Sequence, residues 1–226
     1  MKEMSFSRGL KGKADKLWED GYNHPFVQEL GRGTLPKDSF QFYLLQDYRY
    51  LLSYAKVFAL GALKADTEEL MIRFTAMQRA ALGEMDLHRQ YMADFGVTAE
   101  QIQKVKPSLF SQAYTANMLT AGQLGGCAEI IAAVFPCAWS YADYGKRLKE
   151  AYADNLAENY YRSWIETYAD AAFSASFEWM YDALDDLCQE KNKEELQRLE
   201  EIFISSIEFE YLFWDMAYKK EMSFNR

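Results

Sequence analysis

Cysteine and proline are scarce in this 226-residue chain. The three cysteines, Cys127, Cys137 and Cys188, form neither a CxxC pair nor a zinc-ligand spacing, so we expect no disulfide framework and no structural zinc. An odd, small number of cysteines is typical of a reducing compartment, which predicts a cytoplasmic protein. With only four prolines and few glycines after Gly145, long stretches of Ala, Leu, Met, Glu and Lys run uninterrupted.

Basic charge and long apolar runs are also lacking. The net charge is −9, the pI is about 4.9 and no basic cluster offsets them, so we expect no nucleic-acid surface. The most apolar run, Ile130–Trp139, is too short to span a bilayer, and the first residues lack the apolar segment of a signal peptide. These absences predict neither a nucleic-acid partner nor a membrane partner.

Apolar and aromatic residues, by contrast, are plentiful. Half of the chain is hydrophobic and 16% is aromatic, while β-branched runs of period two are absent. This composition predicts an all-α fold, a single-domain helical bundle over residues 1–226. We expect helices over residues 6–22, 26–30, 36–65, 67–95, 99–105, 108–121, 128–151, 156–190 and 193–218.

The apolar stretch Ala128–Tyr144 is the first candidate site. Val134, Cys137 and Tyr141 follow one another at steps of three and four, which places them on one helix face. Pro136 lacks a backbone donor and predicts a kink, with released backbone polarity beside the cysteine. A thiol there is a candidate nucleophile, although a buried cysteine is more often a simple core residue.

Two other expected core faces carry a carboxylate. Asp47 lies between Leu44 and Leu51 on one helix, and Glu210 lies near Phe213 on another. A buried carboxylate without partners is costly, so each requires either a tyrosine or backbone partner, or a function. Both explanations remain open for a single acid.

Aromatic residues occupy the same expected core faces. Tyrosines lie there on separate helices, at Tyr50, Tyr114 and Tyr168. Together with the thiol and two acids they predict one aromatic-walled pocket. Such a pocket suits a flat heteroaromatic ligand whose amino and ring-nitrogen groups meet the carboxylates.

Glu84 and His88 share a helix face and could form half of a di-iron site. The chain has only two histidines, however, and no second Glu-x-x-His pair exists to complete the set. We therefore expect no metal and interpret the two residues as a buried structural pair.

Several blocks of the chain, in this order, resemble TenA proteins, the thiaminase II or aminopyrimidine aminohydrolase family. The blocks are HPFVQELGRGTLPKDSFQFYLLQDYRYL, ALGEMDLHRQ, AEIIAAVFPCAWSYADYGKRL and EFEYLFWDMAYKKE. The resemblance implies a haem-oxygenase-like bundle without haem or other cofactor, assembled as a homotetramer. It also implies hydrolysis of 4-amino-5-aminomethyl-2-methylpyrimidine to its hydroxymethyl counterpart, and of thiamin to the same pyrimidine plus thiazole, in thiamin salvage.

The same resemblance implies a role for each candidate residue. Cys137, in the block PCAWSY, is the nucleophile, and Glu210, in EYLFW, is the proton-transferring acid and base. One departure is Arg49, where the family has a small or aromatic residue, and it could alter the rim of the pocket. The residues implied to bind the pyrimidine are Asp47, Tyr50, Tyr114, Tyr141 and Tyr168.

Two alternatives remain on the sequence alone. A non-catalytic regulator or carrier of a small heterocycle would need the aromatic pocket and the acids but not the thiol. A di-iron oxidase of the same fold would instead use Glu84 and His88.

Overall fold

The computed structural model describes residues 5–94 and 97–223, apart from the side chains of Glu84, Asp86, Leu87 and His88. The prediction of a Glu84–His88 pair therefore lies outside the described side chains. Within the described residues every regular element is a helix, which confirms the all-α prediction. The first elements are α1 (Phe6–Lys13), α2 (Asp15–Tyr22), α3 (Pro25–Arg32), α4 (Lys37–Lys64), α5 (Glu68–Asp94), α6 (Ala99–Lys104) and α7 (Leu109–Leu124). They are followed by α8 (Cys127–Ala151), η1 (Ala153–Glu158), α9 (Arg162–Ala169), α10 (Ala171–Phe177), α11 (Trp179–Cys188) and α12 (Lys193–Lys219).

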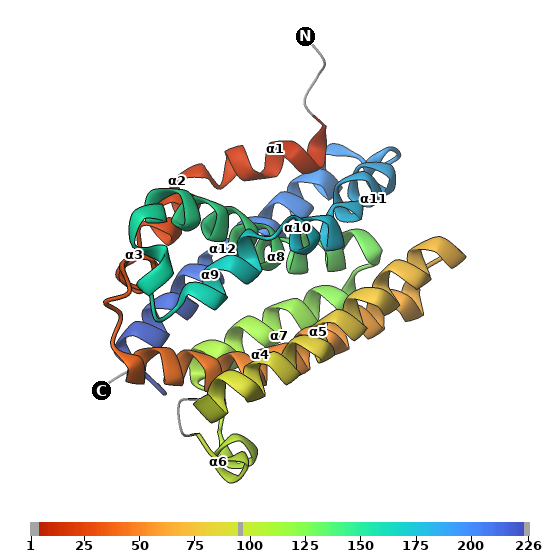
Figure 1. Ribbon diagram of the computed structural model, residues 1–226. Helices are drawn as coiled ribbons and strands as arrows, with labels where there is room; N and C mark the ends of the chain where they lie inside the picture. The colour runs from red at the N-terminus through yellow and green to blue at the C-terminus, as the bar shows by residue number, and fades with distance from the viewer. Residues whose placement is uncertain (1–4, 95–96, 224–226) are drawn as a thin grey trace.

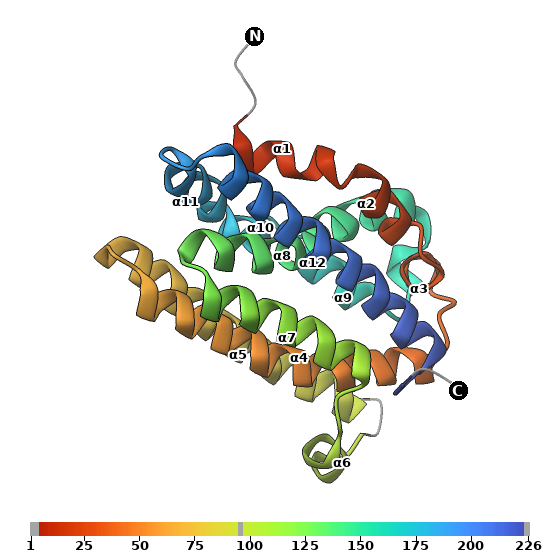
Figure 2. The same ribbon diagram turned by 180° about the vertical axis from the view of Figure 1, so that it is seen from behind.

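The long helices form two layers (Figures 1 and 2). In one layer α5, α4 and α7 lie side by side, and α4 contacts both of its neighbours. In the other layer α8 and α12 pack together, with α9 and α10 against α8. Because α4 and α7 also contact α8 and α12, the apolar faces of both layers meet in one core.

Helix α8 is the central element of this core. Nearly all of its N-terminal half is buried, and the helix continues through Pro136. At its start the Glu129 carboxylate accepts a hydrogen bond from the Gly126 N–H at 2.7 Å, which satisfies one of the free donors of the first turn. The Tyr54 hydroxyl of α4 donates to the Val134 carbonyl at 2.9 Å. A side chain from the other layer thus fixes the turn that carries Cys137.

Two expected helices are divided in the structure. The prediction of one helix over residues 6–22 is wrong, because α1 ends at Lys13 and α2 begins at Asp15. The Ala14 N–H is shared between the Leu10 and Lys11 carbonyls, a three-centre bond typical of a helix end. Leu10, Ala14 and Trp18 are all buried, so the core face continues across the break.

The prediction of one helix over residues 156–190 is also wrong, since η1, α9, α10 and α11 occupy that stretch. Side chains replace helical hydrogen bonds at the breaks. Asn159 donates to the carbonyls of Leu30 and Gly31 at 3.1 and 2.8 Å and accepts from the backbone N–H of Tyr161. Asp170, with extended backbone, accepts from the Ala172 N–H and caps α10.

The division brings α9 close to α8. A Cβ placed on Gly145 of α8 would lie 2.8 Å from the backbone of Tyr168 and Ala169, so the glycine is what permits this approach. The ring of Tyr168 consequently stands edge-on to Tyr141, with 4.8 Å between ring centroids. Tyr141 and Tyr168, two of the predicted site residues, are therefore in contact.

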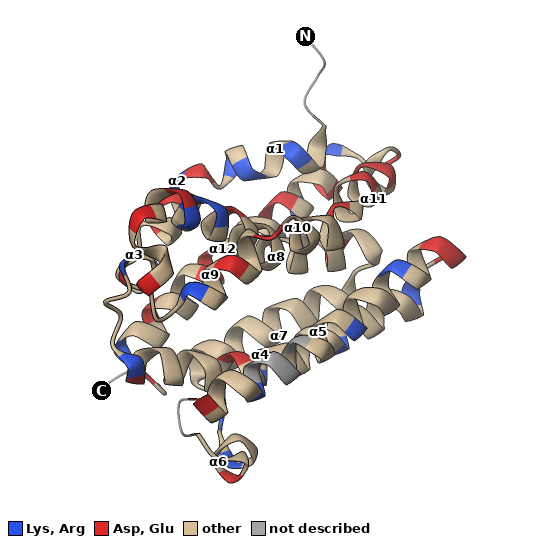
Figure 3. Ribbon diagram, in the orientation of Figure 1, with Lys and Arg blue, Asp and Glu red and all other residues tan. Residues whose placement is uncertain are grey.

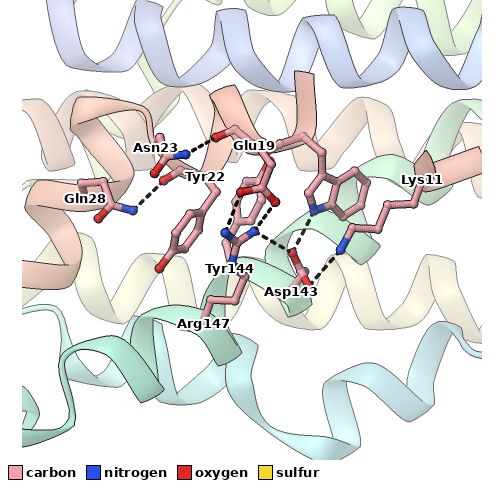
Figure 4. A network of polar contacts seen from close by, with 9 residues as sticks. Lys11, Glu19, Tyr22, Asn23, Gln28, Asp143, Tyr144 and Arg147 are labelled. Carbon is pink, nitrogen blue, oxygen red and sulfur yellow. Dashed lines mark hydrogen bonds and ion pairs between the residues drawn. The ribbon is translucent and has the colours of Figure 1, made fainter. Parts of the chain in front are cut away.

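Charged residues are frequent on α1, α2 and α11, whereas α7 has no charged residue (Figure 3). One charged network fastens α1 and α2 to the C-terminal half of α8 (Figure 4). Arg147 bonds Glu19 at 2.8 and 2.7 Å and lies over the Tyr22 ring at 3.5 Å, and Asp143 accepts from the Trp18 indole at 2.8 Å. The network thus holds the part of α8 around Asp143 and Arg147 against α2. None of the helices in the described part of the chain has the length and apolarity of a membrane span.

Candidate active site

A cavity of about 370 Å³ lies between the two layers, beside α8. Its wall combines residues from α4, α5, α8, α9 and α10. The structure brings most of the predicted site residues together here: Asp47, Tyr50, Cys137, Tyr141 and Tyr168 all line the cavity. The pocket expected from separate core faces is therefore present, with a volume in the range of small-molecule sites.

Glu210 lies immediately behind this wall. Its carboxylate accepts hydrogen bonds from the Tyr114 hydroxyl of α7 and from the Cys137 side chain. The pKa of Glu210 is raised to about 7. Burial is the largest cause, the two hydrogen bonds lower the pKa, and the negative charge of Asp47 raises it. Near neutral pH the carboxyl group can therefore both take up and release a proton.

Tyr50 separates the cavity from Tyr114. The two rings lie 5.1 Å apart, and Tyr50 also stacks on Tyr54 at 5.3 Å. Burial raises the pKa of both Tyr50 and Tyr114 well above the usual range, so each remains a neutral hydrogen-bond donor. Tyr114 faces Glu210 and not the cavity, so its predicted contact with a pyrimidine remains a prediction.

Tyr141, which lines the cavity, is connected to further aromatic residues outside the lining. The Trp164 indole donates to the Tyr43 hydroxyl at 3.3 Å, and that hydroxyl donates to Tyr141 at 3.4 Å. Burial raises the pKa of Tyr141 well above its usual range, and the negative charge of Asp47 acts in the same direction. Tyr141 and Tyr168 form an aromatic wall of the cavity, and the phenol of Tyr141 is neutral. The buried carboxylate of Asp47 belongs to the same lining.

The three cysteines have different surroundings. Cys137 is partly exposed because it faces the cavity, whereas Cys127 and Cys188 are buried elsewhere. Burial raises the pKa of both Cys127 and Cys188 to about 11, so these two remain protonated thiols. The cavity therefore contains one thiol, at the position that the helix periodicity predicts.

Sequence reasoning missed the outer part of the cavity. Met77, Ala80 and Gly83 of α5 and Phe173 of α10 line it, and none of these residues was among the predicted site residues. Arg49 is half-buried and is not among the residues that line the cavity.

Metal binding has no support in the described part of the chain. Among the described side chains, no group of three or more His, Cys, Asp or Glu residues has an arrangement that could hold a metal ion.

The pKa of Glu210 predicts an unusual pH dependence of stability. Its folded pKa of about 7 exceeds its ordinary value of 4.5, so between these pH values the folded state binds a proton that the unfolded chain does not. The resulting stabilisation, roughly 3 kcal/mol, is complete below the unfolded pKa and is lost as the pH rises through 7. Urea unfolding between pH 5 and roughly 8 should show this loss in the parent but not in Glu210→Gln.

Glu208→Gln is the matched control, since Glu208 lies exposed on the same helix. It should retain the pH dependence of the parent. An unchanged slope in Glu210→Gln would mean that the carboxyl group titrates normally.

The sequence of this chain is similar to those of one known protein family. Residues 12–220 match the profile of the TENA/THI-4/PQQC family. An aminopyrimidine aminohydrolase from Halalkalibacterium halodurans is 42% identical over 220 residues, a match that covers 97% of this chain and 98% of the relative.

Solved structures agree with this relationship. A TenA family transcription regulator from a Silicibacter species superimposes with a TM-score of 0.86 at 29% identity, over 92% of this chain and 94% of that one. A domain with a haem oxygenase-like fold from Shewanella denitrificans gives a TM-score of 0.76 at 17% identity, over 93% and 91% of the two chains. The latter likeness concerns the fold alone and confirms the predicted fold class.

Proposed function

Because this chain belongs to the TENA/THI-4/PQQC family, we propose that it is an aminopyrimidine aminohydrolase of thiamin salvage. Its substrate is 4-amino-5-aminomethyl-2-methylpyrimidine, which it hydrolyses to the hydroxymethyl compound. It also hydrolyses thiamin to the same pyrimidine plus thiazole. The observation that carries the proposal is the hydrogen bond between Cys137, which lines an aromatic cavity, and the buried Glu210.

The cavity supports a specific orientation of the pyrimidine. Asp47 is buried in the wall and can accept hydrogen bonds from the amino group and a protonated ring nitrogen. Tyr50, Tyr141 and Tyr168 provide ring faces and phenol groups for the flat ring. When Asp47 accepts a hydrogen bond from a ring N–H, it stabilises the protonated form of the ring. The protonated ring is the more electrophilic form.

Cys137 and Glu210 then supply the chemistry. The thiol passes its proton to the Glu210 carboxylate, and the sulfur adds to a ring carbon adjacent to a ring nitrogen. Glu210 gives that proton to the departing amine as the bond to the exocyclic methylene breaks. It next takes a proton from water, whose oxygen bonds to the methylene. The sulfur then leaves the ring as a thiolate and recovers that proton from Glu210, which restores the thiol and the carboxylate. Tyr114 holds Glu210 in position throughout.

Incubation of the purified protein with both substrates, before and after alkylation of its thiols, tests this function. The expected result is formation of the hydroxymethyl pyrimidine only while Cys137 is free. A protein that binds the pyrimidine yet releases no product from either substrate would instead be a regulator or carrier. The Silicibacter relative is described as a transcription regulator, and a protein of that kind would need the cavity but not the thiol.

Asp47→Asn should weaken pyrimidine binding as well as turnover. The substitution replaces one acceptor oxygen by a donor, so one hydrogen bond to the amidine edge is lost and an N–H faces an N–H. Losing a hydrogen bond to a charged group costs about 1.5–3 kcal/mol, which corresponds to about a 10- to 150-fold rise in the Kd of the hydroxymethyl product. Calorimetric titration measures this change.

Asp143→Asn provides the matched control, because Asp143 is a hydrogen-bonded carboxylate on α8 outside the cavity. It should bind the product like the parent. Unchanged affinity in Asp47→Asn would indicate a structural acid.

We also propose a homotetramer, a cytoplasmic location, a single functional domain and no organic or metal cofactor. The large apolar side chains exposed at the ends of α4, α5 and α7 support self-association. They are Leu63, Met71, Ile72 and Leu124, and a subunit interface would cover them.

A further inference from the structure

Behind Tyr141 lies a chain of two hydrogen bonds whose direction is fixed by chemistry. The Trp164 indole donates to the Tyr43 hydroxyl at 3.3 Å, and Tyr43 donates to the Tyr141 hydroxyl at 3.4 Å. An indole N–H is a donor without an acceptor atom, so the Tyr43 oxygen must accept from it. The hydroxyl hydrogen of Tyr43 is then the one that reaches Tyr141.

Dense packing holds Tyr43 in this arrangement. Its side chain is fully buried, and its ring centroid lies 5.5 Å from that of Phe26 and 5.6 Å from that of Trp214. Trp164 is also buried. Neither Tyr43 nor Trp164 lines the cavity, so a ligand there would not touch them. These two residues can therefore act on a ligand only through Tyr141.

The chain leaves Tyr141 with its own hydrogen to donate. The Tyr141 oxygen accepts from Tyr43, so its O–H is available to a different acceptor. The phenol stays neutral, because burial raises its pKa well above the usual range. Since Tyr141 lines the cavity together with Asp47, the lining offers a donor as well as an acceptor.

A 4-aminopyrimidine needs such a donor. In the proposed function Asp47 accepts from the amino group and from the protonated ring nitrogen next to it. The second ring nitrogen keeps its lone pair, and an acceptor that is buried without a partner costs free energy. The hydroxyl of Tyr141 can donate to this second nitrogen.

We propose that Tyr43, held by the Trp164 indole, is a positioning residue that makes Tyr141 the hydrogen-bond donor to the second ring nitrogen of the substrate. This inference rests on the proposed function and adds a rule of substrate choice to it. A pyrimidine satisfies the Tyr141 donor. The pyridine analogue, with a C–H in place of that nitrogen, leaves the donor unpaired and is rejected.

The test compares the Kd of the hydroxymethyl product with that of its pyridine analogue, by calorimetric titration. The parent should bind the pyridine about 5- to 150-fold more weakly, the usual cost of leaving one buried donor unpaired. In Tyr43→Phe, which keeps the packed ring, this ratio should fall by about 2- to 12-fold, the worth of one neutral hydrogen bond. Trp164→Phe should lower the ratio as well, because Tyr43 could then accept from Tyr141.

A combined variant separates positioning from a structural effect. Tyr141→Phe should remove most of the preference for the pyrimidine. Adding Tyr43→Phe to it should then leave the ratio of the two Kd values unchanged, since Tyr43 acts through Tyr141. A merely structural role of Tyr43 would instead weaken the binding of both compounds equally and would not change their ratio in the parent background.

Tyr144→Phe is the matched control. Tyr144 is also buried, lies on the same helix as Tyr141 and donates to the Trp18 carbonyl at 2.8 Å, but it is outside the cavity lining. It should keep the parental ratio. Equal affinity of the parent for both compounds, or a parental ratio in Tyr43→Phe, would overturn the inference, while turnover of the aminomethyl pyrimidine would leave the proposed function standing. A parent that shows the preference but no turnover would support the inference and contradict the proposed function.

Discussion

Cys137→Ser is expected to lower kcat/KM by about three orders of magnitude or more on both the aminomethyl pyrimidine and thiamin. The affinity for the hydroxymethyl product should change little, since the pyrimidine is held by Asp47 and the aromatic wall. Steady-state kinetics and calorimetric titration of the same preparation measure the two quantities. A large loss of rate with retained binding identifies a nucleophile.

The expected loss of rate follows from the hydrogen bond between the Cys137 thiol and Glu210. Glu210, with a pKa of about 7, can accept a proton from a thiol whose ordinary pKa is about 8.5, but not from the far less acidic hydroxyl of serine. Serine keeps the size and the hydrogen bond of the side chain. It removes only the nucleophile that the proposed mechanism requires.

The other cysteines provide internal controls. Cys127→Ser makes the same change on the same helix, but at a buried thiol whose hydrogen bond is to the Gly61 carbonyl. It should retain turnover, as should Cys188→Ser. Iodoacetamide at neutral pH, followed by peptide mass spectrometry, should modify Cys137 first. Full activity in Cys137→Ser would exclude covalent catalysis by this residue.

The sequence predicted the inner site well because its signal is local. Helix periodicity placed Cys137 and Tyr141 on one face of α8, and a carboxylate on an apolar face marked Asp47 and Glu210. Each of these signals needs only the neighbours within a few turns. The structure agrees with all of them, since every one of these residues lines the cavity or contacts a residue that does.

The outer site and the helix breaks depend on contacts that periodicity does not contain. Asn159 ends a helix by bonding Leu30 and Gly31, which are remote in the chain. Ala80 and Gly83 look like ordinary helix residues until α5 packs on α4 and borders the cavity. Tyr114 was placed in the core correctly, but its hydrogen bond to Glu210 follows from how α7 meets α12.

Glu210→Gln is expected to retain product binding and to lose about 10²- to 10⁴-fold in kcat on the aminomethyl pyrimidine. Glutamine keeps the shape and one acceptor for the Tyr114 hydroxyl, but it cannot exchange a proton. The parent should show a kcat that depends on pH near 7, where burial places the pKa of Glu210, and the variant should lose that dependence.

The leaving group distinguishes the two duties of this carboxyl group. Ammonia must be protonated as it departs, whereas the thiazole of thiamin leaves as a neutral molecule without a proton. The loss in Glu210→Gln should therefore be smaller for thiamin than for the aminomethyl pyrimidine, because only the activation of water is missing. Glu208→Gln, two residues earlier and exposed, should match the parent on both substrates. An equal loss on both substrates would limit Glu210 to the role of base toward water, and the proton for the amine would then have to come from another group.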